Sequence, residues 1–372
     1  MPNFTGQLNA NVIYSPLSNM IISQQVFSDN IKGTYATLVD KARIDGGLYG
    51  DQKIFYSADV LESFEWGADE EAANLLELDR PEPPKVQAIV LNKFRQIRLS
   101  LDNYLTKQAW MDERSFSSFA SVMIQMMGDT KRIYDSTLYN SYIGTTETAI
   151  GRQQQTITLV DGQNDGLTYA RSLANLLVDL KDVTYDFNDY MHTRSYAESD
   201  FIVVWNARFY NEIKYVDLPT IFHKEGLLNE FEQVVLPETY FGVRVGASGQ
   251  STTSPSNVSV RSLVEKRYAV SDELSDPRAK QDKEGNWYVH VFPGQLLPGS
   301  VTYNQNEAYN EDNTIAFKVM HKRSVPYMSA FETGSEFWNP RALVTTRYLT
   351  FGHNTLEYLK NYPFITVRAV EG

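Results

Sequence analysis

The residues that could carry out catalysis or bind a metal are few and scattered along this chain. It contains 5 histidines and no cysteine. A zinc site needs histidines, cysteines or carboxylates at close spacing, as in the HExxH pattern on one helix face, and these histidines form no such pair. They are His192, His223, His290, His321 and His353. We therefore expect no catalytic residue, no metal site and no cofactor, and we do not expect an enzyme.

Motifs that bind phosphate or build a nucleophile are equally missing from the sequence. It contains no GxSxG elbow, no Walker-type phosphate loop and no GxGxxG after a predicted strand. The carboxylates of Asp69, Glu70 and Glu71 are adjacent and could bind a cation, but they do not have the spacing of an EF-hand. A solvated acidic face is the simpler interpretation. A hydrolase with an unrecognised carboxylate pair remains an alternative.

Composition indicates a folded protein of about two domains. The chain has 372 residues, of which 42% are hydrophobic and 22% charged, so it can bury a sizeable core. The formal net charge of −12 argues against a dedicated nucleic-acid binder, because such proteins use lysine and arginine to neutralise phosphates. No signal peptide is recognisable at the start, and no run of 18 apolar residues predicts a membrane span.

Two neighbouring segments carry opposite charge. Asp59–Glu82 holds nine acidic residues and one base, Arg80, whereas Lys85–Leu101 is basic and alternates as a strand does. A change of phase near Arg95 and Gln96 predicts a β-bulge there. The basic segment is either a solvated edge strand or a partner for the acidic segment, within or between subunits.

Nine residues of these segments are the candidates for contacts between subunits. They are Lys85, Lys93, Arg95, Arg98, Glu62, Glu65, Asp69, Glu70 and Glu71.

A long amphipathic helix is predicted over Asp112–Ile143. Its apolar residues recur every three or four positions, for example Phe119, Met123 and Met127, while Ser136 falls on the opposite face. At about 1.5 Å per residue the helix would be about 48 Å long. Gly128, near its middle, costs about 1 kcal/mol relative to alanine, so we expect a bend or close packing there.

Strands and helices alternate after residue 166, which predicts an α/β domain. Leu167–Lys181 has a helical pattern, and Phe201–Trp205 is a continuous apolar run typical of a strand buried on both faces. Helices are then predicted at Ala207–Tyr215 and Ile221–Phe231, followed by a strand at Val234–Leu236.

The remaining segments complete the organisation. Met1–Lys32 is predicted to be an extended arm, and Thr34–Trp66 a long β-hairpin or extended loop. Ala342–Thr350 and Phe364–Val370 are predicted as closing strands, with a short helix or turn at Asn354–Asn361 between them.

Two stretches of the sequence carry a family resemblance. The first is Phe201–Asp217, with the sequence FIVVWNARFYNEIKYVD, and the second is Asn339-Pro340-Arg341 followed by a strand with Tyr348 and Phe351. Both resemble the coat proteins of small, short-tailed phages of Gram-positive hosts. The order of predicted elements is also similar to the coat-protein fold that tailed phages share with herpesviruses.

This resemblance implies an α+β fold with four parts. They are an N-terminal arm (1–33), an extended loop (34–82), a peripheral domain (83–165 and 337–372, with the long helix 112–143) and an axial domain (166–336, with inserted loops at about 242–310).

The function that the resemblance implies is that of a major capsid protein. Copies would assemble as hexamers and pentamers into an icosahedral or prolate shell around double-stranded DNA, with scaffolding and portal proteins as further partners and no membrane. The protein would be found in the virion and assembled in the host cytoplasm. Two alternatives are an encapsulin-like compartment that holds a cargo enzyme, and an aromatic-rich carbohydrate-binding virion protein.

Overall fold

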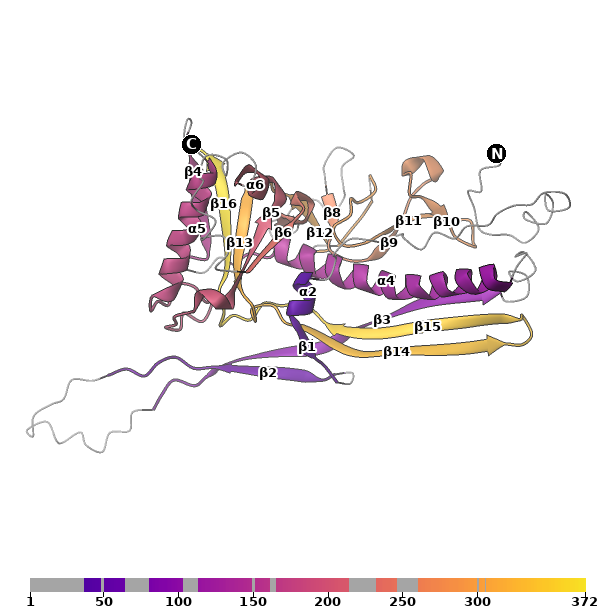
Figure 1. Cartoon of the computed structure of the whole chain (residues 1–372), viewed down its shortest axis with the longest axis horizontal. Helices are drawn as coiled ribbons and strands as arrows, with labels where there is room; N and C mark the ends of the chain where they lie inside the picture. Colours follow the sequence, from indigo (N-terminus) through magenta and orange to yellow (C-terminus); the bar gives the residue numbers. More distant parts are fainter. Residues whose placement is uncertain are drawn as a thin grey trace, which may run out of the picture.

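The molecule is built from a long helix, two five-stranded sheets and a smaller inserted module (Figure 1). The computed structural model describes residues 37–47, 50–63, 80–102, 113–148, 151–160, 165–213, 232–245, 260–299, 301–304 and 306–372. The predicted arm Met1–Lys32 and the predicted helix Ile221–Phe231 lie outside these residues, so both stay predictions.

The predicted long helix is present as α4 (Glu113–Thr145), which has 33 residues. Along its expected apolar stripe Met127 and Tyr134 are buried, whereas Met126 is exposed. Ser136, which we expected on the solvent face, is buried together with its neighbour Asp135. The end of this helix is covered on several sides, so burial there is wider than a single amphipathic stripe predicts.

The first sheet lies alongside α4 and has the strand order β1-β14-β15-β3-β2. It comprises β1 (Arg43–Asp45), β14 (Tyr327–Asn339), β15 (Val344–Asn354), β3 (Lys85–Asp102) and β2 (Gln52–Ser57). The pair β1–β14 is parallel, and the other three pairs are antiparallel. A short helix, α2 (Thr37–Lys41), precedes β1.

Of the two structures predicted for Thr34–Trp66, a long β-hairpin or an extended loop, the hairpin is contradicted by the strand pairing. Its two strands, β1 and β2, do not pair with each other: β1 pairs with β14, and β2 pairs with β3. After β1 the backbone N–H of Gly46 donates to Ser329 O, and the chain then turns at Gly50, where φ is +83°. The projecting hairpin of this protein is therefore β2–β3.

Strand β3 also differs from expectation. The register with β15 shifts between Lys93 and Leu91, at Asn92, and runs without interruption past Arg95 and Gln96. Asn92 leaves the ladder because its Oδ1 accepts hydrogen bonds from the backbone N–H and the hydroxyl of Thr355. Each part of the strand has one paired neighbour among the described residues, since residues 85–90 pair with β2 and Leu91 and residues 93–102 pair with β15.

The second sheet has the order β4-β16-β13-β5-β6 and forms the main core. Its strands are β4 (Gln154–Leu159), β16 (Phe364–Glu371), β13 (Ile315–His321), β5 (Phe201–Asn206) and β6 (Glu232–Leu236).

Helices cover both faces of this sheet, as the alternation of elements predicted. Leucines of α5 (Asp165–Lys181) pack on one face, and Tyr139 and Ile143 at the end of α4 pack on the other. All six residues of β5 are buried, which confirms the strand expected at Phe201–Trp205. A short helix, α6 (Ala207–Asn211), follows β5 and begins the helix predicted there.

The strand pairing divides the C-terminal residues between the two sheets. The resemblance implies that residues 337–372 belong to the peripheral domain; within this range β15 lies in the first sheet, whereas β16 pairs with β13 and β4 in the second sheet. Residues Phe364–Val367 of this strand are buried, so the strand needs cover on both faces. The sheet flanked by two helices supplies that cover. The segment Asn354–Asn361 contains no helix and ends in a turn.

The region expected to be inserted loops contains two small sheets. One is β7 (Gly242–Arg244), β12 (Ala308–Glu311) and β8 (Val260–Ser262). The other is β10 (Lys280–Gln281), β11 (Trp287–Val291) and β9 (Lys266–Ala269). They enclose a separate apolar cluster that includes Tyr268 and Val289, and we call residues 242–310 the inserted module.

Candidate assembly interface

The projecting hairpin β2–β3 has one buried face and one exposed apolar face. Side chains alternate between the two faces of a strand, so Phe55 and Ile89 pack inward. Four apolar side chains point the other way, and we call them the outer hairpin face: Ile54 (44% exposed), Tyr56 (69%), Val86 (54%) and Val90 (38%). Tyr56 is directly opposite Val86 in the register. Apolar side chains gathered on a projecting ribbon indicate a protein–protein contact.

Polar contacts fix the loop end of this hairpin, where Ser57 pairs with Lys85, to the chain between α5 and β5 and to Asn361. Ser57 Oγ lies 2.8 Å from His192 Nδ1 and donates to Asn361 Oδ1. Asp59 Oδ1 accepts a hydrogen bond of 2.8 Å from the backbone N–H of Thr193. Burial acts to raise the pKa of Asp59, but hydrogen bonds from the N–H groups of Val60 and Thr193 outweigh it and hold that pKa below its ordinary value. These contacts therefore hold the loop end of the hairpin against the body.

The contact between Ser57 and His192 has a structural role and not a catalytic one. The two residues are 7% and 5% exposed, so no substrate has access to the serine hydroxyl. That hydroxyl is already committed as a donor to Asn361. In the described residues there is also no group of three or more histidines, cysteines or carboxylates able to hold a metal, nor a helix long and apolar enough to cross a membrane.

The four basic candidates lie in different surroundings along β3. Lys85, Lys93 and Arg98 are exposed, and Arg98 Nε donates to Gln96 Oε1 at 2.9 Å. Arg95 instead forms an ion pair of 2.8 Å with Glu265 of the inserted module, and its guanidinium lies over the ring of Tyr134. In the described residues Arg95 therefore pairs with Glu265 and not with the acidic segment of its own subunit.

The partner of Arg95 was missed because Glu265 is 170 residues away in the sequence. No local spacing could have identified the pair. Of the acidic candidates, Glu62 is exposed beyond the end of β2. The other four, Glu65, Asp69, Glu70 and Glu71, lie outside the described residues.

A buried carboxylate that sequence reasoning missed joins α4 to the first sheet. Asp135 is 1% exposed and lies 3.1 Å from Arg43 Nη2 and 3.4 Å from Lys131 Nζ. The hydroxyl of Tyr327 donates to its Oδ1 at 2.6 Å. Burial and then the nearby carboxylate raise the pKa of Tyr327. This cluster attaches β1 and β14 to the middle of the long helix.

A second exposed apolar site lies at the far end of the β14–β15 hairpin. Residues 332–343 are all exposed, including Phe337 (61%) and Trp338 (46%). The outer hairpin face and this tip both belong to elements that extend from the body (Figure 1). The molecule thus presents apolar surface at its projecting ends, where a neighbouring molecule could cover it.

Comparison with known proteins identifies the kind of molecule that has this architecture. Residues 4–367 match the family described as Phi29-like phage major capsid protein. The chain belongs to that family. It is therefore a capsid protein, and many copies of it form the shell of a phage head in the virion. A search of curated proteins finds no match.

Solved structures of tailed-phage capsids share the fold of this capsid protein. A chain in the structure of the head fibre and inner core protein of native bacteriophage P68 superposes with a TM-score of 0.63 at 10% identity, covering 95% of this chain and 88% of that chain. The capsid structure of Staphylococcus phage Andhra gives 0.59 at 10% identity, covering 99% and 94%. The capsid structure of Cyanophage P-SCSP1u gives 0.51 at 11% identity, covering 96% and 94%.

These matches confirm the predicted α+β coat-protein fold and the capsid function. They do not favour the compartment shell or the carbohydrate-binding protein. Identities near 10% support the fold alone, so the contacts between subunits have to be argued from the residues of this capsid protein.

Proposed function

We propose that the subunits of this capsid protein build their shell by laying the β2–β3 hairpin over a neighbouring copy. The exposed outer hairpin face carries this proposal. Burying a valine, isoleucine or tyrosine side chain contributes roughly 1.5–3 kcal/mol, and symmetry repeats the contact around each hexamer and pentamer. The predicted arm (1–33) and extended loop (34–82) would add further area to the same contacts.

Charge complementarity is proposed to set the register between copies. The acidic Asp59–Glu82 segment and the basic residues of β3 have opposite charge, and complementary charge gives specificity more than affinity. Lys85 and Arg98, both exposed, remain candidates for such contacts. Arg95 would contribute less to such contacts, because its guanidinium already forms an ion pair with Glu265.

The role proposed for the subunit is structural and not catalytic. The shell would enclose double-stranded DNA without sequence-specific binding, since a net charge of −12 opposes tight contact with phosphates. Scaffolding and portal proteins are proposed as further partners, with assembly in the host cytoplasm and no membrane involved. The division into peripheral and axial domains remains part of this proposal.

Substitution of the outer hairpin face tests the proposal. We expect Tyr56→Asp and Val86→Asp to leave the monomer folded, because both side chains are exposed, and to prevent closed shells. Val178→Asp is the matched control, since Val178 is 62% exposed on α5, away from the hairpin. Electron microscopy and sedimentation measure the shells, and circular dichroism checks the fold. Normal shells from both hairpin variants would contradict the proposal.

A further inference from the structure

The outer part of β14 is a free edge of the first sheet in the part of the chain that the structure describes. Strand β1 pairs only with Tyr327–Ser329 of this long strand, and residues 332–339 pair with β15 on their other side alone. Figure 1 shows β14 at the border of the sheet, with β15 between it and β3. At about 3.4 Å per residue the free edge is about 27 Å long.

This edge lacks the features that keep an exposed strand from pairing with another chain. Lysine, proline, a bulge or a short length usually protects such an edge. Residues 332–339 contain neither lysine nor proline, and their register with β15 is uninterrupted from Glu332 to Asn339. Phe337 and Trp338 add exposed aromatic surface, one on each face of the strand. An unprotected edge of this kind is a template for a further strand.

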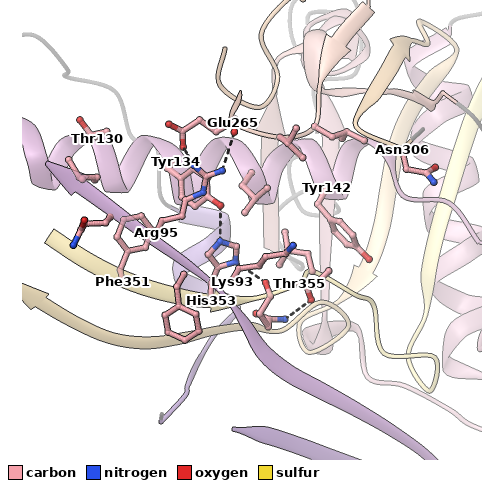
Figure 2. Close-up of a pocket in the computed structure, with 18 of the residues that line it drawn as sticks. Lys93, Arg95, Thr130, Tyr134, Tyr142, Glu265, Asn306, Phe351, His353 and Thr355 are labelled. Carbon is pink, nitrogen blue, oxygen red and sulfur yellow. Dashed lines mark hydrogen bonds and ion pairs between the residues drawn. The ribbon is translucent and has the colours of Figure 1, made fainter. Parts of the chain in front are cut away.

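The charges of this edge are already paired within the subunit. Glu332 and Glu336 each lie 3.1 Å from a cation, Lys131 and Arg347 respectively. The edge therefore neither strongly repels an identical edge nor strongly attracts a basic one. On the basic strand β3, Arg95 is likewise paired, with Glu265 of the inserted module (Figure 2).

Resting on the proposed assembly into hexamers and pentamers, we propose that residues 332–339 pair in antiparallel fashion with the same residues of a second copy across a twofold axis. Rings of subunits have to be joined to each other, and a twofold axis is where two identical surfaces meet. Main-chain hydrogen bonds would then join the first sheets of two subunits into one continuous sheet.

The order of side chains favours a register centred on Ser335. In that register Glu332 lies opposite Trp338 of the second copy, and Glu336 lies opposite Gly334. No two carboxylates then face each other directly, and like charges directly opposite are destabilising. A register centred on Gly334 would place Glu332 opposite Glu336.

A single cysteine on the proposed axis tests this pairing. The chain has no cysteine, so Ser335→Cys supplies its only thiol. Residues directly opposite in an antiparallel pair have Cα atoms about 4.5–5.5 Å apart, and a disulfide spans about 4.4–6.8 Å. We expect diamide, as the oxidant, to convert most Ser335→Cys chains of assembled shells into disulfide-linked dimers on a non-reducing gel.

Thr333→Cys is the matched control, because it is exposed on the same strand. In the proposed register it lies about 14 Å along the strand from its own copy, so we expect at least fivefold less dimer than from Ser335→Cys. Circular dichroism checks that both variants fold. Equal amounts of dimer from the two variants, or none from either, would contradict the pairing.

The outer part of β3 in a second copy is the competing occupant. Ser100 is exposed on that strand, and a mass-tagged Ser100→Cys chain can be coassembled with Ser335→Cys. Mixed dimers without dimers of Ser335→Cys itself would overturn the inference.

Phe337→Lys supplies a second readout that needs no disulfide. A lysine on an edge strand opposes pairing, so we expect the yield of shells to fall severalfold. Val183→Lys, at another exposed apolar position, should keep the yield of the unaltered protein. Full yield from Phe337→Lys would also contradict the pairing.

The two contacts between copies can fail separately. If Tyr56→Asp prevents shells while Ser335→Cys gives no dimers in normal shells, the strand pairing fails and the hairpin contact stands. If Tyr56→Asp and Val86→Asp form normal shells while Ser335→Cys dimerises, the hairpin contact fails and the strand pairing stands.

Discussion

Lys318 is a lysine with no exposed surface in the middle of the second sheet. Its Nζ donates to the carbonyl oxygen of Thr146 at 2.7 Å, immediately beyond the last residue of α4. A cation near the C-terminus of a helix is favourable, but burial lowers the pKa of this lysine from 10.5 to about 7. Between these two pH values the unfolded chain binds more protons than the folded one.

We expect Lys318 to make stability rise with pH between about 7 and 10.5. Its contribution is present above the unfolded pKa and is lost as the pH falls toward the folded one, by up to about 1.4 kcal/mol per pH unit. Urea unfolding from pH 7 to 10 should give a smaller slope for Lys318→Met, while Lys360→Met, at an exposed position, should keep the slope of the unaltered protein. The same slope in all three proteins would contradict this assignment.

Asp135 is the second residue whose environment leads to a prediction. Asp135→Asn removes the buried carboxylate that pairs with Arg43 and Lys131 and leaves these cations only their more exposed partners, Asp40 and Glu332. Breaking a buried ion pair leaves uncompensated charge, and since Arg43 is partly exposed we expect a loss of about 2 kcal/mol or more. Chemical denaturation measures it against Asp129→Asn on the same helix. Equal stability of the two variants would show that the cluster does not hold β1 to α4.

At the scale of elements, the long helix contains a glycine that the described residues do not explain. A Cβ added at Gly128 would meet none of their atoms within 4 Å. The close packing expected there is therefore not found among these residues. The helix continues without interruption on both sides of it.

We expect Gly128→Ala to stabilise the monomer by about 1 kcal/mol, because alanine is the better helix former and has room here. Thermal unfolding measures the gain, and Gly334→Ala, which also has open space but lies in a strand, is the comparison. A destabilised Gly128→Ala monomer would mean that the helix is strained at this residue. Loss of shells by a stabilised monomer would place a neighbouring copy against this part of the helix.

At the scale of the whole molecule, part of the exposed apolar surface lies on the outer hairpin face and at the β14–β15 tip. The body is held by its own clusters around the second sheet, whereas the β14–β15 tip reaches away from that sheet (Figure 1). A subunit whose core is complete and whose assembly interface lies at its periphery can bind neighbouring subunits without unfolding.

Charge reversal at Arg98 tests the register between such subunits. Arg98 is exposed, so we expect Arg98→Glu to fold normally and to lower the yield of shells severalfold, because each weakened contact is repeated around every ring. Arg98→Lys keeps the charge and should assemble. Reversal of Arg95 is less informative, since it would repel Glu265 within the same subunit. Full yield from Arg98→Glu, measured by sedimentation, would rule out its role in register.

The sequence by itself determined the elements whose pattern is local. The long helix and α5 follow from apolar residues every three or four positions, and the buried strand β5 follows from a continuous apolar run. The family resemblance also rested on such local stretches, and with them came the fold class and the capsid function.

Only the tertiary structure decided which segments lie together. The outer half of β14 carries no periodic signal because both of its faces are exposed, and this strand was not predicted. The pairing of β1 with β14, the placement of β16 in the second sheet, and the ion pair between Arg95 and Glu265 join residues far apart in the chain. These pairings depend on which surfaces, distant in the sequence, bury the most apolar area against each other. The spacing of residues along the sequence does not contain that information.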